Sequence, residues 1–299
     1  MEDMRRNHDW LRTCIMQQPR GFLSLVGAIL TEPCSPEADY GVFYIDALTY
    51  QPMCGAGTLS VAKALVETGM VKRVEPETKI VLETPTGLVA VYVKWENHMV
   101  ASINLENVPA FLYRKDLHID LAGYGDVSVD IGYGGNFFVL ADVHSLGLTI
   151  TKDTVNLLRS LSKDILAAAN KVIKVAHPTN PAINYLDQVL FCQNVPEEDG
   201  GYLAQCIFGD AQADISPCGT GTSTRLAQRY FRGLIGLEET FVQKSVCGGA
   251  FHAKGLRETT LGGVPAIVPY VSCSDVHITG FNHLIVEEND KLKNGFVSW

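Results

Sequence analysis

The sequence predicts an α+β fold made of two similar halves. The pentapeptide Cys-Gly-x-Gly-Thr occurs at residues 54–58 and again at residues 218–222, and an amphipathic helical stretch follows each copy. Around both copies, short segments of alternating polarity are separated by turn residues, which is typical of mostly antiparallel sheet rather than of regular β-α-β units. The order of strands, motif, helix and strands is the same in both halves, which indicates one thiol per half of a duplicated protein.

Composition bounds the class of protein. The chain has 299 residues, of which 46% are hydrophobic and 19% charged, and it has no long low-complexity tract, so we expect a globular protein with a large core. The net charge is −9 and the Lys and Arg residues are scattered, which argues against a nucleic-acid partner. The N-terminus lacks the apolar core of a secretory signal, and no stretch approaches the ~18 apolar residues of a membrane span. We therefore expect a cytoplasmic protein without a membrane partner.

In the first half, periodicity predicts two helices and two strands before the first turn-rich region. Residues 9–16 carry apolar side chains at helical spacing and stop before Pro19, which predicts a short helix. β-rich runs at residues 26–30 and 40–45 predict strands joined by a loop. Residues 58–66 place Leu59, Val61, Ala62 and Leu65 on one face, so a helix should start from the first Cys-Gly motif.

The remaining elements follow from the same patterns. Alternating segments predict strands at residues 79–82, 87–95, 101–105, 117–121, 127–131 and 137–140. The longest helical stretch covers residues 151–175 and ends before Pro178. A strand pair at residues 188–191 and 204–208 precedes the second motif, whose helix is expected over residues 223–231.

Cysteine and histidine spacing indicates neither a disulfide framework nor a metal site. The eight cysteines have irregular spacings, and a chain of this length with its own core does not need disulfides, so we expect mostly reduced thiols. No Cys-x2-Cys pair and no His-Glu-x-x-His cluster occurs, so no metal is indicated. Outside the two motifs, we interpret the cysteines as structural: Cys14, Cys34, Cys192, Cys206, Cys247 and Cys273.

The two motifs predict chemistry on a carboxylate-bearing substrate. A helix N-terminus favours the thiolate of a cysteine placed there, and the glycines leave backbone N–H groups free to hold an anion. Removing the α-proton of an amino acid requires that the carboxylate be clamped and the base lie in a dry site. A thiolate on one face of the α-carbon and a thiol on the other would invert that carbon without a cofactor.

The sequence resembles the proline racemases, which share the diaminopimelate epimerase-like fold with the hydroxyproline epimerases. The resemblance runs over nearly the whole chain and rests on these segments: residues 18–21, 53–55, 66–69, Tyr-Gly-Gly-Asn-Phe-Phe at 133–138, 177–178, 208–209, Asp-Ile-Ser-Pro-Cys-Gly-Thr-Gly-Thr-Ser at 214–223, 239–242, 279–282 and 293–296. It implies two pseudo-symmetric lobes, each a mostly antiparallel sheet or barrel around a central helix, with the active site in the cleft between them. The first lobe would comprise residues 1–112 and 283–299, the second residues 113–282. A homodimer is also implied.

The resemblance also assigns residues. Cys54 and Cys218 would be the catalytic thiols of a racemase or epimerase that acts on proline or a hydroxyproline without pyridoxal phosphate. Asp214 would lie by the ring nitrogen of this imino acid substrate. The other implied substrate contacts are Gly55, Ala56, Gly219, Thr220, Gly221 and Thr222, most of them around the carboxylate, and Phe208 against the ring.

Three departures from the family pattern keep alternatives open. Ala56 replaces a family histidine, and Val26 and Tyr44 stand where the family is expected to have further aromatic residues. The usual N-terminal strand with its His-Thr-x-Gly-Glu segment does not occur, so the completeness of the first sheet is left open. One alternative is a catalytically impaired member that binds an amino acid or a protein. Another is a 3-hydroxyproline dehydratase-type lyase, although the related dehydratases replace one thiol by Thr or Ser and this chain keeps both.

Overall fold

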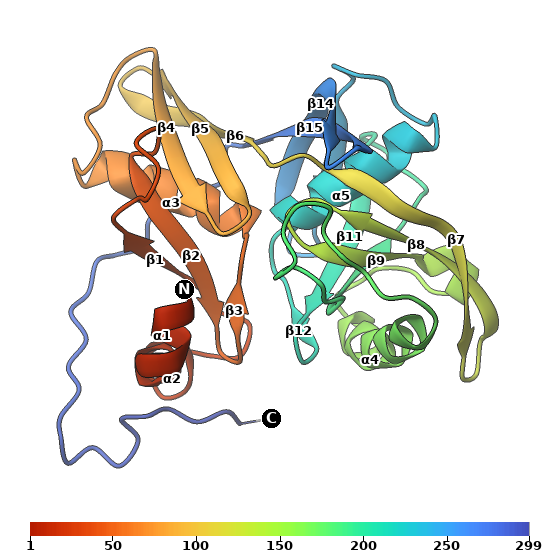
Figure 1. Cartoon of the computed structure of the whole chain (residues 1–299), viewed down its shortest axis with the longest axis horizontal. Helices are drawn as coiled ribbons and strands as arrows, with labels where there is room; N and C mark the ends of the chain where they lie inside the picture. Colours follow the sequence, from red (N-terminus) through yellow and green to blue (C-terminus); the bar gives the residue numbers. More distant parts are fainter. Residues whose placement is uncertain (299) are drawn as a thin grey trace.

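The computed structural model describes residues 1–298 and has two lobes, each with a helix against strands (Figure 1). The predicted α+β class with two lobes is confirmed. One lobe holds α3 (Gly55–Glu67) and the strands β1 (Val26–Thr31), β2 (Tyr40–Asp46), β3 (Tyr50–Gln51), β4 (Glu77–Thr84), β5 (Gly87–Glu96) and β6 (Met99–Glu106). Leu59, Ala62 and Leu65 of α3 are buried, and the helix packs against β1, β5 and β6.

The other lobe is built around α5 (Gly219–Phe231). Its strands are β7 (Phe111–Leu121), β8 (Gly125–Tyr133), β9 (Phe137–Asp142), β10 (Gln188–Cys192), β11 (Tyr202–Phe208), β12 (Gln212–Ala213) and β13 (Phe241–Lys244). The helix packs against β7 and β8, and α4 (Val155–Val172) covers β7, β10 and β11 from outside. Arg225 of α5 is fully buried because its guanidinium donates to the carbonyl oxygens of Leu203 and Gln193.

A long hairpin joins the two lobes. Strands β14 (Ala250–Leu261) and β15 (Val264–Cys273) pair with each other, β15 pairs with β6, and β14 pairs with β13, so the strand order runs without a break from β1 to β7 (Figure 1). Both members also pack against α5. The relative placement of α3 and α5 is therefore held by main-chain hydrogen bonds.

The differences from the predicted elements have physical causes. Both motif helices begin earlier than predicted, at Gly55 and Gly219, because the motif cysteines cap them. Helix α4 begins later than expected because the Thr154 hydroxyl donates to the carbonyl oxygens of Thr149 and Thr151 and holds a turn there. Helix α1 (Glu2–Asn7), which we did not predict, buries no side chain, so it has no apolar periodicity to detect.

The C-terminal segment returns to the N-terminal helices (Figure 1). Gln18 and Phe296 form an antiparallel bridge, and the Arg20 guanidinium pairs with Asp290 at 2.5 Å. Within residues 1–298, no helix combines the length and apolar character needed to cross a membrane.

Candidate active site

Each motif cysteine caps one of the two central helices. The Cys54 Sγ accepts a hydrogen bond from the Gly57 amide at 3.3 Å, and the Cys218 Sγ accepts one from the Gly221 amide at 3.4 Å. The same contact at the same spacing in both lobes shows that the duplicated pentapeptide builds one local structure twice. Cys218 has φ 64°, in the left-handed region, whereas Cys54 is extended. Such strain in a non-glycine residue is typical of a site whose surroundings hold it in place for function.

The two helix N-termini abut, and glycine is what allows it. A Cβ on Gly55 would lie 2.7 Å from the Gly219 Cα, and a Cβ on Gly219 would lie 2.6 Å from the Gly55 Cα. No side chain fits at either position without moving a helix. The first-turn N–H groups that the cysteine caps leave free therefore lie close together at this junction, where they can serve as a site for an anion such as a carboxylate.

The structure brings the predicted residues together around a small cavity between the two helices. Its lining includes both catalytic candidates and six of the eight predicted substrate contacts: Cys54, Gly55, Ala56, Phe208, Asp214, Cys218, Gly219 and Thr220. Gly221 and Thr222 do not line it. The Thr222 hydroxyl instead accepts a hydrogen bond from Gln243 and donates one to the Pro217 carbonyl oxygen. The Gly221 amide donates to the Cys218 Sγ.

A larger cleft of about 840 Å³ adjoins this cavity. Four residues line both spaces: Val26, Cys54, Ala56 and Asp214. Cys54 is half-buried and Cys218 is only 6% exposed, so a ligand in the cleft meets Cys54 first. Because Ala56 is small, the wall beside Cys54 is open where the family pattern places a histidine.

Burial dominates the electrostatics of the site. It raises the pKa of Cys54 to about 12, and negative charge on Asp214 and Cys218 adds to the shift, while the Gly57 amide opposes it. Burial also raises the pKa of Asp214, against hydrogen bonds from Ser216 and Cys218. The expected lowering of the thiol pKa by the helix N-terminus therefore does not prevail at Cys54. A cation between these groups would stabilise their anionic forms.

Sequence reasoning missed two asparagines that position the site. The Asn136 amide donates to the Met53 carbonyl oxygen at 2.9 Å and so ties the β8–β9 turn to the residue before Cys54. The Asn107 amide donates to the Gly134 carbonyl oxygen and to the Ser223 hydroxyl of α5. The Tyr-Gly-Gly-Asn segment indicates a turn, but nothing local to it predicts that the Asn136 amide reaches Met53, 83 residues away in the chain.

A third missed residue is Cys206, which we had interpreted as structural. Its thiol lies in contact with that of Cys218, and this contact together with burial holds the pKa of Cys206 well above its ordinary value. Strand alternation could have indicated that Cys206 lies near the site, because Cys206 and Phe208 are two residues apart on β11 and point to the same face of the strand. A residue that shares a face with a predicted ring contact belongs near the cavity.

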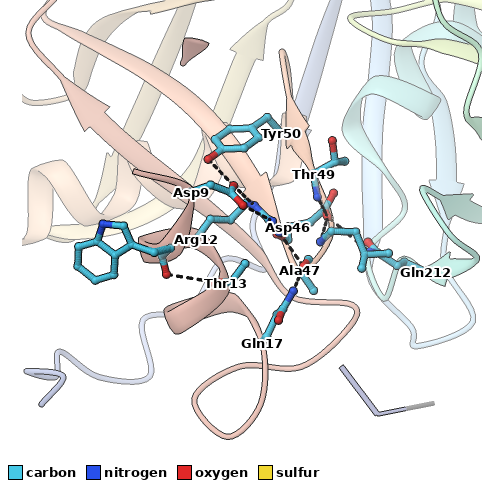
Figure 2. Close-up of polar contacts among 11 residues, drawn as sticks. Asp9, Arg12, Thr13, Gln17, Asp46, Ala47, Thr49, Tyr50 and Gln212 are labelled. Carbon is cyan, nitrogen blue, oxygen red and sulfur yellow. Dashed lines mark hydrogen bonds and ion pairs between the residues drawn. The ribbon is translucent and has the colours of Figure 1, made fainter. Parts of the chain in front are cut away.

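A polar network around Asp46 lies next to the site (Figure 2). The Arg12 guanidinium of α2 (Asp9–Met16) donates to the Asp46 and Ala47 carbonyl oxygens at 3.1 and 2.7 Å. The Asp46 carboxylate accepts from Gln51, which lines the small cavity, at 2.9 Å, and from Gln212 of the other lobe at 3.5 Å. The network therefore connects helix α2, the cavity residue Gln51 and both lobes.

Fold and site together define a two-lobed protein in which a thiol from each lobe faces one cavity where two helices meet end to end. The chain belongs to the proline racemase family, whose model matches residues 1–297. It is 38% identical over 296 residues to a proline racemase from Clostridioides difficile, covering 99% of this chain and 88% of the relative. It is 37% identical over 295 residues to a trans-3-hydroxy-L-proline dehydratase from Azospirillum brasilense, covering 98% and 88%.

A solved structure gives the same fold. The hydroxyproline epimerase from Agrobacterium vitis with bound trans-4-hydroxy-L-proline superposes with a TM-score of 0.90 at 30% identity, covering 96% of this chain and 82% of that one. The predicted family and its racemase or epimerase character are thus confirmed. These names leave the ring substituent of the substrate open.

Proposed function

We propose that the chain is a racemase or epimerase that inverts the α-carbon of proline or a hydroxyproline with Cys54 and Cys218 as its two thiols. The observation that carries the proposal is the pair of cysteines, each capping one of two abutting helices and both lining one cavity. An imino acid that enters from the adjoining cleft and widens this cavity of about 20 Å³ would have its α-carbon between the two sulfur atoms. One sulfur then serves each face of that carbon.

The proposed reaction moves one proton in and one out. The thiolate on one face takes the α-proton and becomes a thiol, while the thiol on the other face gives its proton to the carbanion and becomes a thiolate. The first-turn amides around Gly55 and Gly219 hold the substrate carboxylate as negative charge develops beside it. The secondary ammonium of the substrate faces Asp214 and supplies the cation that stabilises the anionic groups.

Solvent exchange tests this mechanism. Purified protein in D2O should exchange the α-proton of proline or 4-hydroxyproline and produce the opposite configuration, as read by NMR and chiral chromatography. Cys54→Ser and Cys218→Ser should each abolish racemisation, because a serine hydroxyl is a far weaker base than a thiolate. Cys247→Ser is the matched control, since this thiol is exposed and lies outside both cavities. Racemisation that survives in either active-site variant excludes the two-thiol mechanism.

Ala56 motivates the second candidate, an impaired family member that binds an imino acid with little turnover. Restoring the family residue in Ala56→His separates the two, because an impaired site should gain rate whereas a site adapted to another substrate should not. Ligand-induced thermal stabilisation without turnover would favour the impaired member. A third outcome, loss of hydroxyl from trans-3-hydroxyproline, would indicate the lyase. We also expect a homodimer, which light scattering tests.

A further inference from the structure

The proposed reaction uses two thiols, yet a third lies with them. Cys206 of β11 is 1% exposed, and its Sγ, an Asp214 carboxylate oxygen and the Cys218 Sγ all lie within 4.8 Å of one another. These positions are eight and four residues apart in the chain, a spacing without a familiar metal signature. The fold alone brings them together.

The main chain holds these three residues in place. The Asp214 amide donates to the Cys206 carbonyl oxygen at 3.0 Å. The Gln205 side-chain amide donates to the carbonyl oxygens of both Cys206 and Asp214, at 3.0 and 2.9 Å, and the Cys218 amide donates to the Ser216 hydroxyl at 3.0 Å. The side chains are therefore presented from fixed backbone, as a metal site requires.

The geometry and the donor types fit a soft dication. In a tetrahedral site with metal–sulfur bonds of about 2.3 Å, two sulfur ligands lie about 3.8 Å apart, so the two sulfur atoms need to close by no more than about 1 Å. Two thiolates and one carboxylate favour Zn²⁺ or Cd²⁺ over Mg²⁺ or Ca²⁺. Cys54 lines the same small cavity, so the fourth position is open to its sulfur or to a water molecule.

We propose that Cys206, Asp214 and Cys218 form a binding site for a thiophilic dication such as Zn²⁺ or Cd²⁺, and that the ion inhibits the enzyme by capturing Cys218. The inhibition rests on the proposed function, whereas the binding does not. The metal displaces the thiol protons on binding and occupies the place where the substrate ammonium would face Asp214. Metal and imino acid therefore exclude each other.

Cadmium titration of the reduced, metal-free full chain tests the site. Wild type should show the ultraviolet charge-transfer band of cadmium thiolate and saturate at one ion per chain, and Mg²⁺ should not compete. Cys206→Ala should weaken binding at least about tenfold, because loss of even an outer-shell partner of a metal ligand costs that much. Asp214→Asn, which keeps both sulfur atoms and the side-chain size, should also weaken it.

Cys192→Ala is the matched control. Cys192 is a buried thiol on the neighbouring strand and belongs to the same apolar cluster, but its sulfur donates to the Leu190 carbonyl oxygen instead. This variant should bind cadmium as wild type does. The site is overturned if wild type lacks the band, if Cys206→Ala binds with unchanged affinity, or if Cys54→Ser loses the metal while Cys206→Ala keeps it.

Measuring α-proton exchange in the presence of Zn²⁺ separates this proposal from the proposed function. Zn²⁺ at stoichiometric excess should stop α-proton exchange, a chelator should restore it, and saturating proline should raise the zinc concentration needed. If no imino acid exchanges while the cadmium results hold, the racemase proposal fails and the metal site stands. If exchange occurs but zinc leaves its rate unchanged, capture of Cys218 is refuted.

Discussion

Replacing Gly55 by alanine should lower the rate of turnover strongly and the free energy of unfolding only modestly. The added Cβ would lie 2.7 Å from the Gly219 Cα, whereas ordinary contact lies between 3.4 and 4 Å, so the helix ends must separate by about 0.7 to 1.3 Å. This displacement acts directly on the spacing of the two capping cysteines. A misplacement of about 1 Å between reacting groups costs on the order of 100-fold in rate.

The stability cost of the same change should be modest. Overpacking costs about 1–3 kcal/mol, and the better helix propensity of alanine offsets up to about 1 kcal/mol of it. We therefore expect the rate of α-proton exchange to fall about 100-fold while the free energy of unfolding in urea falls by about 1–2 kcal/mol. Gly219→Ala should behave alike, since its Cβ would lie 2.6 Å from the Gly55 Cα.

Gly280→Ala provides the control, because nothing lies within 4 Å of a Cβ at that position and its backbone is not left-handed. This variant should keep the wild-type rate and gain a few tenths of a kcal/mol from lower entropy of the unfolded chain. A Gly55→Ala protein that is folded and exchanges the α-proton within about threefold of wild type would refute the argument that the abutting helix ends set the spacing of the thiols.

Two further predictions concern residues next to the site. Asn136→Ala leaves the buried Met53 carbonyl oxygen without its donor, so urea unfolding should show a loss of about 1–3 kcal/mol together with a slower exchange rate; unchanged stability would contradict the role of this bond. Burial and the nearby Asp46 raise the pKa of Asp187 from 3.8 to about 6, and its Oδ1 has no hydrogen-bond partner. The folded state therefore retains this proton longer than the unfolded state, and stability is lost as the pH rises from about 4 through 6. Asp187→Asn should gain up to about 3 kcal/mol at pH 7 and little at pH 4, and equal gains at both pH values would refute this cause.

Local patterns were enough to predict most elements of this fold. The helix expected over residues 9–16 has those ends in α2, and the strands expected at residues 26–30 and 87–95 differ from β1 and β5 by one residue at one end. These segments have strong apolar periodicity, which reports burial directly. The two motif helices were also found, because glycines and a cysteine cap stand before an apolar stripe.

Long-range pairing could not be predicted in the same way. We predicted neither strand of the β14–β15 hairpin, which links β6 to β13. Nothing local specifies which strands lie on its two sides, since partners are chosen by the packing of whole sheets. For the same reason, the sequence offered Cys206 no connection to Cys218, although strand alternation fixed the face to which Cys206 points.

The duplicated motif builds two similar helix caps in unequal surroundings. Cys54 is half-buried, extended in backbone and beside the cleft, whereas Cys218 is buried, left-handed in backbone and in contact with Cys206 and Asp214. A racemase needs its two sulfur atoms to exchange roles in each turnover, so unequal surroundings must be balanced by the substrate itself. In the proposed mechanism an imino acid does this, because its carboxylate would lie between the two helix ends while its cation would face Asp214. Because the enantiomers of proline have equal free energies, the two directions must have equal kcat/KM, so the unequal surroundings of the thiols should show only as different kcat and KM values near saturation.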